Sequence, residues 1–268
     1  MPRLAVLGNL SRDLVDGGPP RLGGTPFWAA RALRVLGSPA LVAVKCANAD
    51  RAEFARPLVA LGIPVLWLGG SSTATFSFRY SGDRREMTVE GIGDSWSPED
   101  VRGLGEARWV HVGALARSDF PAETLAELAA GGQRRVLLDG QGLTRPARTG
   151  PLELDGDFDP EVLRHVAVLK VAEEELRALV GEPDEAGLRA LGVPEVVVTL
   201  GSRGSLVYAD GRLERVTAQP VGGPIDPTGA GDAFAVAYLA ARAGGHAPVA
   251  SARRAGALVT GLLARRLR

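Results

Sequence analysis

Residues 226–234 read DPTGAGDAF, a segment that combines turn-forming residues with the start of a long apolar run. Pro227 disfavours a helical conformation for the residue before it, and the Gly-Ala-Gly that follows leaves the backbone almost bare of side chains. Small and apolar helix formers then run from 233 to 241. The pattern predicts a turn that leads into a helix N-terminus, with Asp232 in the first helical turn.

A helix N-terminus of this kind has two chemical capabilities. Backbone N–H groups without helical partners and the helix dipole together bind an anion. A carboxylate in the first turn can accept a proton from a hydroxyl group that points at that anion. Phosphoryl transfer requires both functions. The stretch by itself also allows a simpler interpretation, in which a glycine-rich cap begins a buried helix and Asp232 only complements the dipole.

The stretch resembles the C-terminal signature of the ribokinase-like (PfkB) family of carbohydrate kinases. The resemblance implies that Asp232 is the catalytic base and that the amides of Gly229, Ala230 and Gly231 form an anion hole for the transferred phosphoryl group. It further implies that ATP is the donor, that Mg²⁺ neutralises its phosphates, and that the acceptor is a hydroxyl group of a small carbohydrate or polyol.

Length and composition set wider limits. With 268 residues the chain could form one large α/β domain or two small ones, and its formal net charge of zero does not favour nucleic acid or a membrane as partner. Cys46 is the single cysteine, so no intrachain disulfide is expected. A secretion leader and an apolar run of ~18 residues are both lacking, which predicts a soluble, cytoplasmic protein.

Apolar strand patterns alternate with helix patterns along most of the chain. Strands are expected at 4–7, 40–46, 63–68, 109–115, 136–139, 166–171 and 195–200, and helices at 27–36, 50–61, 118–130, 159–164, 173–180, 182–191, 229–243 and 248–266. Residues 146–158 are expected to be a long loop. Such alternation predicts βαβ units and a mostly parallel sheet. With the resemblance, the predicted fold is α/β, a ribokinase-like three-layer αβα sandwich in a single domain over 1–268.

A different pattern interrupts this alternation. Residues 73–80 alternate, with aromatic side chains at 76, 78 and 80, and residues 81–84 have turn chemistry before a second strand at 85–90. This predicts a small β-strand lid over the site, with strands inserted at about 12–22 and 73–90; an ordinary edge hairpin is the alternative. An exposed edge of the hairpin could also pair with a second subunit and form a homodimer.

The resemblance extends to an acceptor site near the N-terminus. Gly23-Gly24 resembles the di-glycine of the family, which lets backbone amides approach sugar hydroxyls, and Asp13 matches a carboxylate that binds those hydroxyls. The glycines alone also fit a simple turn before a helix. Many relatives have an asparagine a few residues later, where this chain has Trp28. This difference makes ribose and fructose less expected as substrates.

The segment KVAEEEL at 170–176 resembles the N-x-x-E segment of the family, with Ala172 in place of the asparagine. The resemblance assigns Glu175 to the surroundings of the magnesium ion, through water. Lys170 is expected either to reach the phosphates of the nucleotide or to be solvated. The neighbouring glutamates are expected only to complement the helix dipole.

Two more stretches resemble donor and cation sites. Residues 199–204 read TLGSRG, which resembles the nucleotide turn of the family and implies that Thr199, Gly201 and Gly204 bind the nucleotide. Asp226 and Thr228 match the place where relatives bind a monovalent cation such as K⁺.

The run DGQGLTR at 139–145 bears on the acceptor. A D-x-Q-G-x-x-R run resembles the myo-inositol kinase branch of the family, which would place Gln141 and Arg145 beside the substrate. A polar loop at the end of a strand is the alternative. Two other functions also stay open: a nucleoside kinase of the same fold, with Trp28 and lid aromatics stacked on a base, and a nucleotide- or metabolite-binding protein that has lost catalysis.

Overall fold

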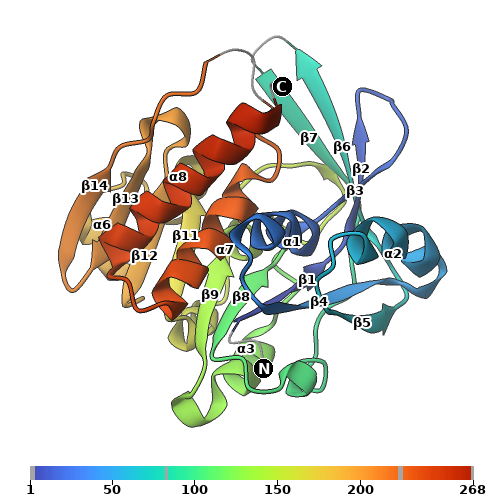
Figure 1. Cartoon of the computed structure of the whole chain (residues 1–268), viewed down its shortest axis with the longest axis horizontal. Coiled ribbons are helices and arrows are strands. Elements are labelled where there is room, and N and C mark those ends of the chain that lie inside the picture. Colours follow the sequence, from blue (N-terminus) through green and yellow to red (C-terminus); the bar gives the residue numbers. More distant parts are fainter. Residues whose placement is uncertain (1–3, 82–83, 223–225, 267–268) are drawn as a thin grey trace.

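The computed structural model describes residues 4–81, 84–222 and 226–266, and its centre is a nine-stranded sheet (Figure 1). In spatial order its strands are β14 (Arg212–Val216), β13 (Ser205–Ala209), β12 (Glu195–Thr199), β11 (Val168–Ala172), β9 (Arg135–Asp139), β8 (Trp109–Gly113), β1 (Leu4–Asn9), β4 (Ala40–Ala47) and β5 (Val65–Gly70). The seven strands from β12 to β5 pair in parallel, and β13 and β14 add an antiparallel hairpin at one side.

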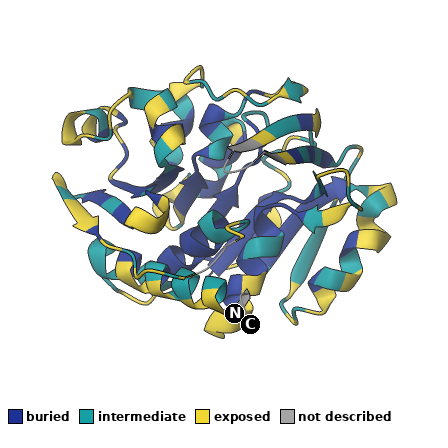
Figure 2. Cartoon of the chain, turned by 90° about the horizontal axis from the view of Figure 1, so that it is seen from above, coloured by how far each residue is buried: buried dark blue, intermediate teal, exposed yellow. Residues whose placement is uncertain are grey.

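Helices cover both faces of this sheet. One face carries α1 (Thr25–Leu36), α2 (Arg51–Val59), α7 (Ala230–Ala243) and α8 (Pro248–Arg266); the other carries α3 (Ala122–Ala129), α5 (Glu173–Val180), α6 (Glu185–Ala190) and the 3₁₀ helix η4 (Pro160–His165). Successive residues of β1 enter opposite clusters, with Val6 facing α1 and α7 and Leu7 facing α3, because side chains alternate along a strand. Figure 2 shows the buried strands enclosed between partly exposed helices. This three-layer arrangement confirms the predicted fold class.

A second, five-stranded sheet contains the strands predicted to form the lid, and it is called the lid sheet, or lid, below. Its order is β10 (Gly150–Pro151), β7 (Arg84–Gly91), β6 (Ala74–Ser81), β2 (Ser11–Val15) and β3 (Arg21–Gly23). Phe76 and Phe78 are buried in an apolar cluster with Val89 and Leu115. The hairpin is therefore part of a separate sheet and not an edge hairpin of the main sheet. The turn predicted at 82–83 lies outside the described residues.

The expected route to a homodimer depends on an exposed hairpin edge, and part of that edge is covered at the base of the hairpin. There β6 lies between β7 and β2, and β7 pairs with β10. The outer strands of the described lid are β3, with three residues, and β10, with two. Residues 79–81 and 84–86 extend beyond these partners, so pairing of the hairpin with a second subunit stays a prediction.

Some predicted boundaries are wrong for local reasons. The helix expected at 118–130 begins at Ala122, because Pro121 occupies the N-cap position and the residue before a proline is biased towards extended backbone. The loop at 146–158 contains the short strand β10, which pairs with the lid. The strand-end run at 141–144 is a short helix, α4 (Gln141–Thr144), where a loop was expected.

Two other expectations from the sequence can be checked in the structure. Cys46 is buried in β4, as predicted, and burial raises the pKa of its thiol to about 11. Among the described residues, no helix combines the length and the apolar character needed to cross a membrane.

Candidate active site

The signature stretch forms a tight corner before α7. Gly229 is the N-cap of the helix and has a left-handed backbone, with φ of 74°. A Cβ atom at Gly229 would come within 2.3 Å of the indole ring of Trp28, so no side chain can be accommodated there. Trp28 therefore packs directly on the corner, at the position where many relatives have an asparagine.

The corner has fewer available amides than the sequence suggests. The N–H group of Ala230 donates to the carbonyl of Pro227 at 2.9 Å, so one of the three amides predicted for the anion hole is already bonded in the turn. The first N–H groups of any helix have no partner inside the helix. The expectation of an anion hole therefore rests on the amides of Gly229 and Gly231.

Asp232 lies in the first turn of α7, and the side chain of Thr25 holds it in place. Thr25 donates its hydroxyl hydrogen to Oδ1 of Asp232 at 2.6 Å. Asp232 is 9% exposed, and burial raises the pKa of its carboxyl to about 6, with a further upward contribution from the charge of Asp139. The hydrogen bond from Thr25 and the charges of Lys170 and Arg145 act in the opposite direction. A buried carboxyl with a raised pKa fits a general base.

A buried ion pair lies under the corner. Nζ of Lys170 lies 3.3 and 3.4 Å from the two carboxylate oxygens of Asp139. A Cβ atom at Gly231 would come within 3.0 Å of the same nitrogen, so the ammonium group lies against the start of α7. Burial would lower the pKa of Lys170, but the nearby carboxylates, with Asp139 first, raise it above its usual range. Lys170 is only 3% exposed, so the expectation that it is solvated is wrong.

Glu175, the residue expected near magnesium, is also buried. Its Oε2 accepts a hydrogen bond from the amide of Ala172 at 2.8 Å and so completes the N-terminus of α5. Burial raises the pKa of Glu175, while the charge of Lys170 acts to lower it. The carboxylate therefore has a local structural role, and its expected place near magnesium stays a prediction.

The expected acceptor residues come together where β2 and β3 meet α1. Oδ1 of Asp13 accepts a hydrogen bond from the hydroxyl of Ser11 at 2.7 Å. A Cβ atom at Gly23 would lie 2.2 Å from Oδ2 of Asp13, so the absence of a side chain lets the backbone approach that carboxylate. Gly24, with φ of 90°, is the N-cap of α1; Thr25, which follows it, is the first helical residue.

Gln141 and Arg145 lie at the two ends of α4. Gln141 is its first residue and Arg145 its C-cap, and both are half-buried. The charge of Arg145 acts on Asp232 and Glu175, so the D-x-Q-G-x-x-R run brings a cation to the corner.

The predicted nucleotide turn begins beside the segment that follows Lys170. Thr199 ends β12 opposite Ala172 of β11, and its hydroxyl donates to the carbonyl of Val171 at 3.3 Å. Gly201 begins the short 3₁₀ turn η5 (Gly201–Arg203) and Gly204 is its C-cap. The turn therefore lies at the same end of the sheet as the corner.

Asp226 and Glu175 were expected near cations, and each accepts a hydrogen bond from a backbone amide. Oδ1 of Asp226 accepts from the amide of Thr228 at 2.9 Å, a local turn that leaves binding of K⁺ an expectation. No group of three or more His, Cys, Asp or Glu side chains that could hold a metal occurs in the described ranges. Because Oε2 of Glu175 is bonded to an amide, the residues fit a magnesium ion held mainly by donor phosphates and water.

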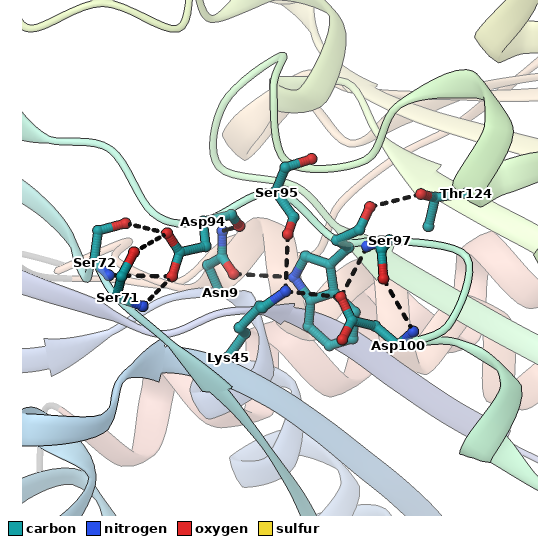
Figure 3. A network of polar contacts seen from close by, with 10 residues as sticks. Asn9, Lys45, Ser71, Ser72, Asp94, Ser95, Ser97, Asp100 and Thr124 are labelled. Carbon is teal, nitrogen blue, oxygen red and sulfur yellow. Dashed lines mark hydrogen bonds and ion pairs between the residues drawn. The ribbon is translucent and has the colours of Figure 1, made fainter.

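A second polar cluster, shown in Figure 3, lies at the base of the lid. Asp94, which follows β7, accepts hydrogen bonds from the amides and hydroxyls of Ser71 and Ser72, which precede β6. Nζ of Lys45 donates to Asp100 at 2.7 Å and to the carbonyl of Ser95 at 2.8 Å. This cluster joins the chain segments that enter and leave the lid hairpin.

Sequence reasoning missed Thr25 as a partner of Asp232, and it missed the roles of Asp139 and Lys45. A lysine inside an apolar strand such as ALVAVKCA is one signal that could have been used, because a buried ammonium group requires a carboxylate nearby. The bond between Thr25 and Asp232 had no such signal in the sequence.

Comparisons with known proteins identify the family of the chain. Residues 87–261, more than half of the chain, match the model of the pfkB family carbohydrate kinases. A ribokinase of Arabidopsis thaliana is 34% identical over 98 residues, and a fructokinase of Vibrio alginolyticus is 32% identical over 152 residues. These stretches are 33% and 54% of this chain, but they span only 26% and 48% of those two relatives.

Solved structures share the fold over nearly the whole chain. A pyrophosphate-dependent kinase in the ribokinase family, solved with a pyrophosphate analog and myo-inositol, gives a TM-score of 0.84 at 23% identity and covers 97% of this chain and 94% of its own. The Arabidopsis ribokinase with ribose and ATP gives a TM-score of 0.73 at 21% identity, covering 98% and 92%.

Proposed function

The chain belongs to the pfkB family of carbohydrate kinases, and we propose that it transfers a phosphoryl group to a hydroxyl group of a small carbohydrate or polyol. The observation that carries the proposal is the corner before α7, where Asp232 has a raised pKa beside a bare glycine turn. Such a corner combines a base with an anion-binding backbone, and both lie at the strand ends where ligands of open α/β sheets bind.

In the proposed reaction each group at the corner has a separate task. Asp232 accepts the proton of the acceptor hydroxyl as that oxygen attacks the phosphorus atom. The amides of Gly229 and Gly231 bind the charge on the transferred group. Lys170 adds positive charge beneath the corner and compensates Asp139 and Asp232, which limits their mutual repulsion.

The donor site is proposed to lie beside the corner. Magnesium, with Glu175 bound through water, would neutralise donor phosphates. For an ATP donor, Thr199, Gly201 and Gly204 would contact the nucleotide. The likeness to a pyrophosphate-dependent kinase, with a TM-score of 0.84, favours pyrophosphate as a second candidate donor. Either donor would bind through its phosphates at the corner, and only ATP would also need a site for its nucleoside.

The acceptor that these residues support best is a cyclic polyol such as myo-inositol. Asp13 offers a carboxylate that can accept bonds from two neighbouring hydroxyls. The myo-inositol in the similar pyrophosphate-dependent kinase supports this class. A nucleoside has less support, because the ring of Trp28 packs against Gly229 and under Arg31, and Phe76 and Phe78 are buried in the lid.

Product formation tests the proposal with two donors and four acceptor classes. ATP and pyrophosphate, each with Mg²⁺, are combined with myo-inositol, ribose, fructose and a nucleoside, and phosphate esters are detected by ³¹P NMR. We expect an inositol phosphate with at least one donor and little product from the Asp232→Asn variant. Absence of a phosphate ester in every combination would contradict a kinase, and donor binding by calorimetry without turnover would support the binding protein instead.

A further inference from the structure

Thr25 does not use its hydroxyl as a threonine at a helix N-terminus usually does. Threonine there commonly caps the helix by accepting a hydrogen bond from a backbone amide. In this protein the N-cap is Gly24, and the hydroxyl of Thr25 donates to Oδ1 of Asp232 at 2.6 Å. The two residues are 207 positions apart in sequence, and Thr25 is 1% exposed. The bond therefore joins the start of α1 to the start of α7 inside the protein.

Packing fixes the orientation of this side chain. A Cβ atom at Gly113, the last residue of β8, would lie 2.1 Å from the Cγ2 methyl of Thr25. The methyl group thus fills the space beside a glycine while the hydroxyl bonds to Asp232. With the methyl held against β8, the hydroxyl is directed at Asp232. The methyl group of Thr25 therefore contacts β8, and its hydroxyl binds Asp232.

Helix α1 also connects the expected acceptor site to the corner. Thr25 follows Gly23 and Gly24 directly, and Gly23 lies against the carboxylate of Asp13. One helical turn after Thr25, the ring of Trp28 packs on Gly229. A single rigid element thus contacts the acceptor carboxylate through its leading glycines and the corner through two side chains.

We propose that Thr25 is a positioning residue for Asp232. By occupying Oδ1, it directs Oδ2 to the hydroxyl of an acceptor that is bound at Asp13 and the di-glycine. Because Thr25 and the di-glycine belong to one continuous segment, the base and the acceptor are placed relative to each other by the same helix N-terminus. This inference rests on the proposed kinase function for its catalytic meaning, but the contact itself does not.

The charged groups around Asp232 predict how loss of the Thr25 hydroxyl changes the pKa of its carboxyl group. Asp139 of β9 faces it with like charge, and Lys170 of β11 and Arg145 after α4 face it with opposite charge. Burial and Asp139 favour the protonated form, whereas Thr25, Lys170 and Arg145 favour the ionised form. Removal of the hydroxyl should therefore raise the pKa of Asp232 and misalign its carboxylate.

Two substitutions separate the hydroxyl from the packing. Thr25→Val keeps the shape and removes the donor, and Thr25→Ser keeps the donor and removes the methyl. We expect Thr25→Val to lower kcat by about 10- to 100-fold, as for loss of a hydrogen bond to a charged group. The KM of the acceptor should change less than kcat, and the acid limb of the pH profile should move to higher pH. Thr25→Ser should stay close to wild type.

A readout without turnover keeps this test separate from the kinase proposal. The carboxyl of Asp232 is titrated by ¹³C NMR in the full chain, and its signal is assigned by its loss in Asp232→Asn. Its pKa should rise in Thr25→Val and stay near the wild-type value in Thr25→Ser. Should the valine variant fail to fold, Thr25→Ala is compared with Thr25→Ser. Both lack the methyl group, so the difference between them isolates the hydroxyl. If no acceptor reacts in the wild type, the kinase proposal fails while the titration still decides the role of Thr25.

Two results would overturn the positioning role. In the first, Thr25→Val has the kcat and the Asp232 pKa of the wild type. In the second, Thr25→Ser loses more activity than Thr25→Val, because then the methyl contact with Gly113 and not the hydroxyl would matter.

Discussion

The two lysines of the chain allow a comparison between two polar clusters of the same fold. Lys45 in β4 is paired with Asp100 at the base of the lid, and Lys170 in β11 is paired with Asp139 under the α7 corner. Both lysines lie near the C-terminal ends of parallel strands, and each has a carboxylate partner. The clusters differ in how many donors surround each carboxylate.

At the lid base, hydrogen-bond donors lower the pKa values of the carboxyl groups by more than burial raises them. Burial would raise the pKa of Asp94 and of Asp100, but the serine donors around Asp94, and Lys45 with Ser97 around Asp100, hold both below the usual range. At the corner the balance is reversed, because burial raises the pKa of Asp232 and of Glu175. Carboxylates that donors surround stabilise the scaffold, and carboxylates short of donors are the candidates for proton transfer.

The largest expected effect comes from removing the buried ammonium group. Lys170→Met leaves Asp139 fully buried beside Asp232 without its counter-charge, so the free energy of unfolding should fall by about 3–5 kcal/mol. The matched change Lys45→Met should cost about 1–2 kcal/mol, because Asp100 is partly exposed and keeps the amide of Ser97. Urea unfolding at pH 7 measures both changes.

The double variant Lys170→Met with Asp139→Leu is the control for this comparison, since it removes both charges together. It should recover much of the lost stability. Equal losses for the two single lysine variants would show that the two clusters do not differ as described.

Asp232→Asn should have the next largest effect, but on turnover. If Asp232 is the base, kcat should fall by about 10²-fold or more, because the amide cannot accept the proton. The thermal midpoint at pH 7 should stay the same or rise, since the variant removes a buried charge. Initial rates and a thermal melt are the two measurements, and a turnover number near that of the wild type would exclude this residue as base.

The two clusters should also respond to pH with opposite sign. Asp232 has a pKa of about 6 when folded and about 3.8 when unfolded, so the folded state binds more protons between about pH 4 and 6. Stability relative to Asp232→Asn should therefore fall as pH rises through this window, by no more than about 3 kcal/mol. The contribution of Asp94 is present above about pH 4 and is lost as pH falls further. Unfolding curves at several pH values test both signs.

The smallest effect should come from one carboxylate of the lid base. Asp94→Ala removes an acceptor from Ser71 and Ser72, and because these residues are partly exposed the free energy of unfolding should fall by only about 1–2 kcal/mol. Ser71→Ala, which removes one of the hydroxyl donors, is the matched control and should cost less. No loss in Asp94→Ala would mean that this cluster does not stabilise the lid.

Much of the fold could be predicted from the sequence because its strands are buried on both faces. Apolar runs such as LAVL at 4–7 and VVVT at 196–199 need no detail of side-chain contact to be recognised. Boundaries that depend on one residue were less predictable. Ser118 resembles an N-cap, but Pro121 decides where α3 begins. The pairing of β10 with the lid joins Gly150 to Val89 and Pro151 to Thr88, which are far apart in the chain, and a two-residue strand has no periodicity.

The candidate site was predictable only where its residues are close in sequence. The signature places Asp232 and the bare turn together, and both occur in the structure. Lys170 could not be interpreted from its own segment, because its partner Asp139 lies opposite it in the neighbouring strand. Thr25 shows the same limit. A threonine hydroxyl at a helix N-terminus commonly bonds to the nearby backbone, whereas here it donates to Asp232, 207 positions away.

The lid sheet draws its strands from three separate excursions of the chain: β2 and β3 after β1, β6 and β7 after β5, and β10 after β9. A chimera that imports the lid of another protein would therefore need three pairs of junctions, and a single crossover between two related genes would deliver only part of a lid. New acceptor preferences in such a scaffold are expected to accumulate by point substitution and not by exchange of a cassette.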